Sequence, residues 1–244
     1  MPADLEDRVA IVTGANSGLG AAVCDRLTED RVQVVPVDLH GDGCLHADVA
    51  TGEGNRLMID TALERHGRLD ALVLNAGVQF VAPIPDFPVE QWDRLMDVMV
   101  KGPFLAIKYA WPHLTERPGG RIVVTASTSS ITAEAYKCAY VAAKHAVNGL
   151  VKVAALEGGT LGLTANAVAP GWMRTEMVES QLEDQMRLRG LPREETIEAM
   201  LSRQPVKKFL ETSEVANLIA FLASKNSTGI TGTCIPIDLG TLAC

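Results

Sequence analysis

The chain has 244 residues, of which 47% are hydrophobic, and its net charge is −8. One α/β domain often has this length, and the apolar content is enough for a sizeable core. The acidic balance argues against a nucleic-acid or anionic-membrane binder, which would need a basic surface. The apolar runs are far shorter than the roughly 20 residues of a membrane span, and no signal peptide is expected. Five scattered cysteines without a C-x-x-C pair favour a reduced, cytoplasmic protein.

Short β-branched runs alternate along the chain with longer segments of helical period. They predict strands at 8–13, 32–37, 69–74, 121–126, 163–169 and 233–237. Runs that are apolar throughout suit strands covered on both faces, and helices are expected between them, most clearly at 139–157. The pattern predicts a doubly wound parallel sheet of the Rossmann type, in a single domain over 1–244. A polar, helical stretch at about 175–205 interrupts the alternation and is a candidate mobile lid over the substrate.

The first predicted strand runs into a glycine-rich turn, T-G-A-N-S-G-L-G at 13–20. Glycines there allow a sharp turn and the close approach of a pyrophosphate, which the free N–H groups of the next helix can bind. The second strand ends at Asp38, whose carboxylate can accept both ribose hydroxyls of NAD and would repel the 2′-phosphate of NADP. We therefore expect NAD as cofactor. The turn residues expected to bind it are Gly14, Asn16, Ser17, Gly18 and Leu19.

The connection after the second strand, residues 40–47, has no room for a full crossover helix. It contains His40, Cys44 and His46. Their spacing matches no common ligand set, so no metal site is expected.

A candidate catalytic group follows in the second half of the chain. Tyr140 and Lys144 are four residues apart on a predicted helix and so share one face. An ammonium beside a phenol favours the phenolate, and the sequence predicts a lowered Tyr140 pKa suited to proton exchange with an alcohol. Ser127, at the end of a predicted strand, can polarise the same carbonyl.

Order and spacing together make the chain resemble a short-chain dehydrogenase/reductase. The matching segments are 13–20, Asp48, N-A-G at 75–77, Ser127, Y-V-A-A-K at 140–144, Asn166 and P-G-W-M-R-T at 170–175. The resemblance implies hydride transfer with Ser127, Tyr140 and Lys144 as catalytic residues. It also implies a homotetramer, with interfaces at 139–157 and 92–110. Further cofactor contacts are implied for Asp48 and Val49, for Asn75, Ala76 and Gly77 on the adenosine side, and for Pro170, Gly171, Met173 and Thr175 at the nicotinamide carboxamide.

Within that family the chain is most similar to D-3-hydroxybutyrate dehydrogenases. The shared segments include 77–79, 81–84, 87–90, 137–145, 170–172 and Gln204-Pro205. The resemblance implies that Lys137 pairs with a substrate carboxylate, that Gln79 and Gln181 hydrogen-bond it, and that Trp172 walls the apolar end. The expected reaction interconverts a 3-hydroxy acid, such as 3-hydroxybutyrate, with its ketone.

Three positions depart from these patterns. Ser129 stands where the subgroup has a histidine, and Asp238-Leu239-Gly240 replaces the family's D-G-G, so a larger or more polar hydroxy acid also fits. Met99 replaces a catalytic asparagine. Since Pro103 has no N–H, the Met99 carbonyl loses its helical partner and can still hold the water that contacts the catalytic lysine in the family. We expect Met99 not to abolish activity.

Two alternatives stay open at this stage. One is the same chemistry on a cyclic diol, a sugar or a polyketide-type ketone. The other is an NAD-binding sensor or scaffold without catalysis, which Met99 suggests.

Overall fold

The structure is a computed structural model that describes Leu5 and residues 7–243. Within these residues seven parallel strands form one sheet in the order β3-β2-β1-β4-β5-β6-β7. This is the predicted doubly wound sheet, in a single α/β domain. The strands are β1 (Val9–Thr13), β2 (Gln33–Asp38), β3 (Leu45–His46), β4 (Ala71–Leu74), β5 (Arg121–Thr125), β6 (Thr164–Pro170) and β7 (Cys234–Ile237).

All six predicted strands are present, with ends within two residues of the prediction. The sequence missed β3, a two-residue strand that pairs in parallel with the end of β2. No helix lies in the short connection before it, as expected. The ring Nε2 of His46 lies 3.0 Å from the carbonyl oxygen of Gly41. The described residues contain no group of three His, Cys, Asp or Glu side chains that could hold a metal.

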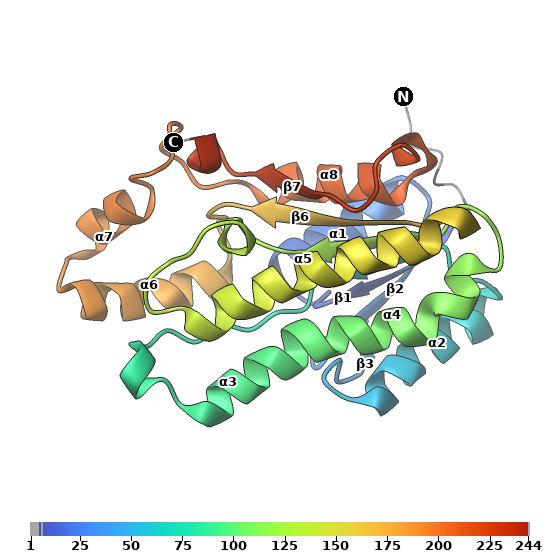
Figure 1. Cartoon of the computed structure of the whole chain (residues 1–244), viewed down its shortest axis with the longest axis horizontal. Helices are drawn as coiled ribbons and strands as arrows, with labels where there is room; N and C mark the ends of the chain where they lie inside the picture. The colour runs from blue at the N-terminus through green and yellow to red at the C-terminus, as the bar shows by residue number, and fades with distance from the viewer. Residues whose placement is uncertain (1–4, 6, 244) are drawn as a thin grey trace.

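Helices cover both faces of the sheet (Figure 1). On one face lie α2 (Gly52–His66), α4 (Gly102–Thr115) and α5 (Cys138–Gly158), and on the other lie α1 (Gly18–Glu29) and α8 (Thr212–Ala223). Helix α3 (Val89–Met96) precedes α4. No helix in the described part of the chain is long and apolar enough to cross a membrane.

Alternation along the strands explains the two cores. Ile11, Leu72 and Ile122 are register partners across β1, β4 and β5 and pack on the face of α2, α4 and α5. Their chain neighbours Val12 and Val73 point to the other face, toward α1 and α8. Because both faces are covered, every residue of these strands is buried, which is why the sequence shows continuous apolar runs.

The polar stretch at 175–205 folds as two helices, α6 (Glu176–Arg189) and α7 (Arg193–Met200). Thr175 caps α6, and Gly190 in the left-handed conformation ends it. Figure 1 shows both helices at one end of the molecule, beyond the tips of β6 and β7. The helical content is as predicted, and this position beside the strand ends is where a substrate lid is expected.

Candidate active site

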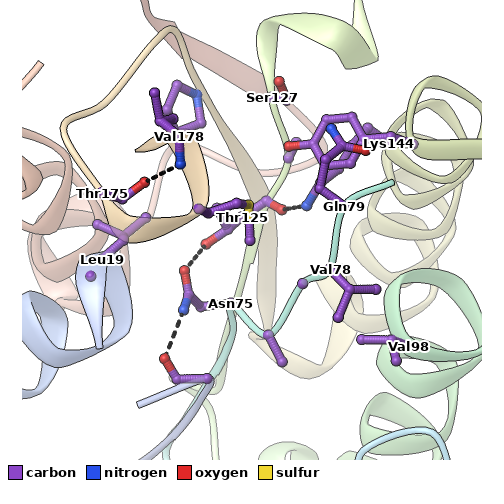
Figure 2. A pocket seen from close by; sticks show the side chains of 18 of the residues that line it. Leu19, Asn75, Val78, Gln79, Val98, Thr125, Ser127, Lys144, Thr175 and Val178 are labelled. Carbon is purple, nitrogen blue, oxygen red and sulfur yellow. Dashed lines mark hydrogen bonds between the residues drawn. The ribbon is translucent and has the colours of Figure 1, made fainter. Parts of the chain in front are cut away.

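A cavity of about 760 Å³ opens at the carboxyl ends of the parallel strands. This edge is where α/β sheets bind their ligands, because the loops that leave neighbouring strands part there. Nearly all the predicted site residues line it: Gly14, Ser17, Gly18, Leu19, Asp38, Asp48, Val49, Asn75, Ala76, Gly77, Gln79, Ser127, Lys137, Tyr140, Lys144, Pro170, Gly171, Trp172, Met173, Thr175 and Gln181. The exception is Asn16. Figure 2 shows Leu19 and Thr175 on one side of the cavity and Ser127, Gln79 and Lys144 on the other.

The glycine turn is shaped for a bound phosphate group. Gly14 has a φ of +66°, and a Cβ there would lie 2.9 Å from the Cα of Ala76. A Cβ on Gly20 would lie 1.8 Å from the carbonyl oxygen of Gly14. The start of α1 can therefore pack this closely against the turn only because residue 20 has no side chain. The N–H groups of the first turn of α1 therefore face the cavity at close range. These residues fit the pyrophosphate of a dinucleotide.

Asp38, at the end of β2, lines the same cavity. One carboxylate oxygen accepts the N–H of Asn16 at 3.0 Å and the other accepts the N–H of Leu39 at 2.7 Å. The carboxylate thus braces the glycine turn while it lines the cavity. Asn16 acts through this backbone contact, which explains why it is in the turn without lining the cavity.

Asn75, on the cavity wall, links the end of β1 to the end of β5. Its amide nitrogen donates to the carbonyl oxygens of Thr13 and Gly14 at 3.1 and 3.2 Å, and its oxygen accepts the Thr125 hydroxyl at 3.1 Å. Figure 2 shows this chain of contacts across the floor of the site. The side chain's polar atoms are engaged with β1 and β5, so Asn75 shapes the cofactor site from beneath.

Ser127 and Tyr140 meet at the opposite end of the cavity. Ser127 lies near enough to the Tyr140 phenol to act to lower its pKa, and Ser127 Oγ accepts the N–H of Ser129 at 3.1 Å. The N–H from Ser129 orients the serine oxygen, which leaves its O–H free to turn toward the phenol or a substrate oxygen. A hydroxyl and a phenol are thereby directed at one point.

Lys144 is buried below Tyr140. Its Nζ donates to the carbonyl oxygen of Thr125 at 2.7 Å and lies 5.4 Å from the centre of the Tyr140 ring. Burial lowers the pKa of Lys144 to about 8. Burial also raises the pKa of Tyr140 to about 12, against the opposing effect of Ser127. The predicted lowering of the Tyr140 pKa is therefore wrong for the chain alone, because desolvation of the phenolate outweighs its neighbours.

Lys137 marks the substrate end, just before α5. It is only 3% exposed, and its Nζ lies 4.2 Å from the centre of the Trp172 ring. Its Nζ also forms an ion pair with Glu134 Oε2 at 2.8 Å. Burial lowers the pKa of Lys137, while the Glu134 carboxylate acts to raise it. Lys137 thus already has a carboxylate partner within the chain, which the sequence analysis does not predict.

Gln79 and Gln181 present different atoms to the cavity. The Oε1 of Gln79 accepts the N–H of Phe80 at 3.0 Å, which leaves its amide nitrogen to donate. The amide nitrogen of Gln181 donates to the carbonyl oxygen of Met177 at 3.1 Å, and its buried Oε1 has no partner in the described structure. The Gln79 amide nitrogen can donate to a carboxylate. Gln181 can offer its second N–H as a donor and its Oε1 as an acceptor, so its predicted contact with a carboxylate stays a prediction.

Comparison with known proteins agrees with this geometry. A family model described as enoyl-(acyl carrier protein) reductase matches residues 13–241. The D-beta-hydroxybutyrate dehydrogenase of Rhizobium meliloti (strain 1021) is 39% identical, over 97% of this chain and 99% of its own. The chain is a short-chain dehydrogenase/reductase. The D-beta-hydroxybutyrate dehydrogenase of Cupriavidus necator is 35% identical, over 98% of this chain and 99% of its own. The ligand-free aldohexose dehydrogenase of Thermoplasma acidophilum superposes with a TM-score of 0.92 at 31% identity, over 100% and 97% of the two chains.

The Met99 substitution in this short-chain dehydrogenase/reductase is accommodated as a core side chain. Met99 is 2% exposed and packs in an apolar cluster with Leu95, Ala139, Ala143 and Tyr140. It lies on a π-helical turn, Asp97–Lys101, between α3 and α4. In this turn the hydrogen bonds run to the N–H five residues on, as from the Asp97 carbonyl to Gly102, in place of the α-helical pattern that Pro103, with no N–H, cannot continue. The thioether therefore supports Tyr140 by packing.

The second departure lies near the C-terminus. Leu239 has a φ of +54°, a left-handed conformation that glycine adopts more easily. Its side chain packs against the core on the α1 and α8 face. Asp238 stabilises the turn by accepting the N–H groups of Gly240 and Leu242 at 3.1 and 2.8 Å. Apolar packing and the aspartate together retain the turn although Leu239 replaces the first glycine.

Sequence reasoning missed several residues around the site. Glu134 pairs with Lys137, the Thr125 carbonyl holds Lys144, and α3 adds charged side chains to the cavity wall, namely Glu90, Asp93 and Arg94. Glu134 lies in a loop three residues before Lys137, where no helical period predicts contact. The only indication of this ion pair in the sequence is that an acidic residue, Glu134, lies close to Lys137 along the chain.

Proposed function

We propose that the chain is an NAD(H)-dependent oxidoreductase that interconverts a 3-hydroxy acid with its 3-oxo acid. The observation that carries the proposal is the buried ammonium of Lys137, set one helical turn before Tyr140 on the wall of the same cavity. A substrate with its oxygen at Tyr140 and a carboxylate at Lys137 spans these two groups. The two relatives named above as D-beta-hydroxybutyrate dehydrogenases support an acid substrate, whereas the name aldohexose dehydrogenase indicates that the fold also serves neutral substrates.

Three residues carry the proton chemistry in this proposal. In the oxidation, the alcohol O–H gives its proton to Tyr140 while the hydride on the same carbon leaves for the cofactor. Ser127 hydrogen-bonds the substrate oxygen. Lys144, held by the Thr125 carbonyl, places a positive charge next to the phenol of Tyr140. When bound, NAD⁺ would supply the hydride acceptor and a positive charge that would favour the phenolate of Tyr140. The raised pKa of Tyr140 keeps it protonated in the chain alone, which is the form that donates in ketone reduction.

The cofactor in this proposal is NAD. Asp38 supports this choice because its carboxylate lines the cavity and would repel a ribose 2′-phosphate. Gly14, Gly18 and Leu19 would bind the pyrophosphate, while Met173 and Thr175 would hold the carboxamide.

The assembly in this proposal is a homotetramer. Large apolar side chains are exposed on the helices where such interfaces are expected, including Phe104 on α4 and Val153 and Leu156 on α5, with Leu156 81% exposed. Val153 and Leu156 are three residues apart, so they share one face of α5. An apolar helix face of this kind is suited to a second copy of the chain.

Replacing Lys137 tests the substrate class. Lys137→Met should raise KM for 3-hydroxybutyrate about ten- to a hundredfold, because a charged hydrogen bond is lost, and should change KM for a neutral secondary alcohol far less. The double variant Lys137→Met/Glu134→Gln controls for the carboxylate left unpaired. Equal losses on acid and neutral substrates would overturn the hydroxy-acid proposal.

A further inference from the structure

The Lys137–Glu134 ion pair changes what the substrate end of the cavity can recognise. The pair joins a buried ammonium to a half-buried carboxylate, with side-chain exposures of 4% and 32%. A paired ammonium attracts an anion less strongly than a free one, since the partner carboxylate repels it at short range. A simple 3-hydroxy acid bound at Lys137 has no further donor to offer the Glu134 carboxylate.

One of the two carboxylate oxygens of Glu134 is outside the ion pair with Lys137. Its Oε2 is paired with Lys137, and no hydrogen bond of its Oε1 occurs within the described part of the chain. An ionised carboxylate accepts hydrogen bonds and donates none. A ligand that satisfies this oxygen therefore has to bring a donor.

Gln181 gives a second, independent indication of the same need. Its side chain is 6% exposed and lines the active-site cavity, and its Oε1 is buried without a partner. One N–H of the amide donates to the carbonyl of Met177, and the oxygen is the acceptor that the side chain offers a ligand. A buried acceptor without a donor is unfavourable, and a ligand hydroxyl that donates to it would remove this penalty.

There is also room for an additional group. A second cavity of about 110 Å³ shares Thr128, Glu134, Gly171 and Trp172 with the main one. Arg189 and Arg203 line its far side. Glu134 thus stands between two open volumes, and a hydroxyl or hydroxymethyl group can reach it without displacing a core side chain.

We propose that Glu134 and Gln181 form a hydroxyl-binding subsite, and that the substrate is a 3-hydroxy acid with a second hydroxyl group. The carboxylate accepts from Lys137 and from the amide nitrogen of Gln79. The second hydroxyl donates to Glu134 or Gln181. This inference rests on the proposed function and narrows its substrate class from simple to dihydroxylated acids.

A comparison of three acids tests the subsite. The substrates are 3-hydroxybutyrate, 2,3-dihydroxybutyrate and 3,4-dihydroxybutyrate, each as the pure stereoisomers, with kcat/KM measured by NADH formation. The wild type should prefer one dihydroxy acid over 3-hydroxybutyrate by about tenfold or more, as expected for one charged hydrogen bond. Glu134→Ala should lower that preference, because one of the two acceptors is lost, and should raise kcat/KM for 3-hydroxybutyrate, because Lys137 loses its counterion.

Two further variants keep the test specific. Gln181→Met keeps the side-chain volume but removes the acceptor, so it should reduce only the dihydroxy preference. Asp184→Ala breaks an ion pair of the same three-residue spacing, with Arg187 on α6 and outside both cavities, and should leave the preference unchanged. Thermal unfolding of each variant verifies that it is folded.

The outcomes separate the two proposals. A wild type that prefers 3-hydroxybutyrate, or Glu134→Ala losses that are equal on all three acids, would overturn the subsite while the hydroxy-acid function stands. Turnover of neutral diols with none of the acids would overturn both.

Discussion

The ammonium of Lys144 is fixed on the carbonyl oxygen of Thr125 at 2.7 Å, while the ring of Tyr140 is centred 5.4 Å from the same nitrogen. β5 therefore ends in the group that positions the lysine, and the next turn supplies Ser127. Lys144 is buried and Tyr140 is partly buried, and burial disfavours the ionised form of each in the chain alone. This coupling of burial and charge leads to a first prediction.

Stability should depend on pH through Lys144. Its pKa is about 8 in the folded chain against 10.5 ordinarily, so between these values the unfolded chain binds more protons. The penalty for burying the ammonium is thus full below pH 8 and disappears as the pH rises to 10.5. Relative to Lys144→Met, the wild type should gain up to ~3 kcal/mol in this window. Urea unfolding of both proteins at about pH 7 and 10 measures it. A pH-independent difference would contradict the assignment.

Asp38 should set the cofactor preference by its charge. Asp38→Asn keeps an oxygen acceptor for the turn but removes the repulsion of a 2′-phosphate. KM for NADP should fall about tenfold, equivalent to roughly 1.4 kcal/mol, with little change for NAD. Asp42→Asn, an exposed change of the same charge in the neighbouring loop, is the matched control. A wild type that uses NADP as well as NAD would show the assignment to be wrong.

Met99 should be compatible with catalysis. Met99→Asn buries an amide among Leu95, Ala139 and Ala143, and should lower the free energy of unfolding by ~1–3 kcal/mol without a large gain in kcat. Met99→Leu conserves volume and should cost less than about 1.5 kcal/mol. The prediction fails if the wild type is inactive on every substrate while Met99→Asn gains robust turnover.

The exposed apolar face of α5 should hold copies of the chain together. The wild type should have the mass of four chains by light scattering at micromolar concentration. Leu156→Asp places a charge on that face and should lower the mass, whereas Glu157→Gln, also on α5, should not. A monomeric wild type would refute the tetramer.

The sequence predicts the fold and the cofactor end well, and the substrate end less well. Buried strands such as β1 and β4 leave continuous apolar runs, and the turn at Gly14 needs glycine, so both are visible as local patterns. The strand β3 is two residues long and gives no period. The Lys137–Glu134 pair and the Gln181 orientation depend on how a loop and α6 fold over the cavity, which no local pattern records. The Tyr140 pKa was mispredicted because spacing shows its neighbours and not its burial.

The most direct test of the central claim measures NADH formation from a panel of alcohols. It compares the wild type with Tyr140→Phe. The panel contains 3-hydroxy acids, their methyl esters, cyclic diols and aldoses. We predict that kcat/KM for a 3-hydroxy acid exceeds that for its own ester by about tenfold or more, and that Tyr140→Phe loses at least about a hundredfold of it while staying folded. Higher kcat/KM on the esters, diols or aldoses, or an unimpaired Tyr140→Phe variant, would contradict the account.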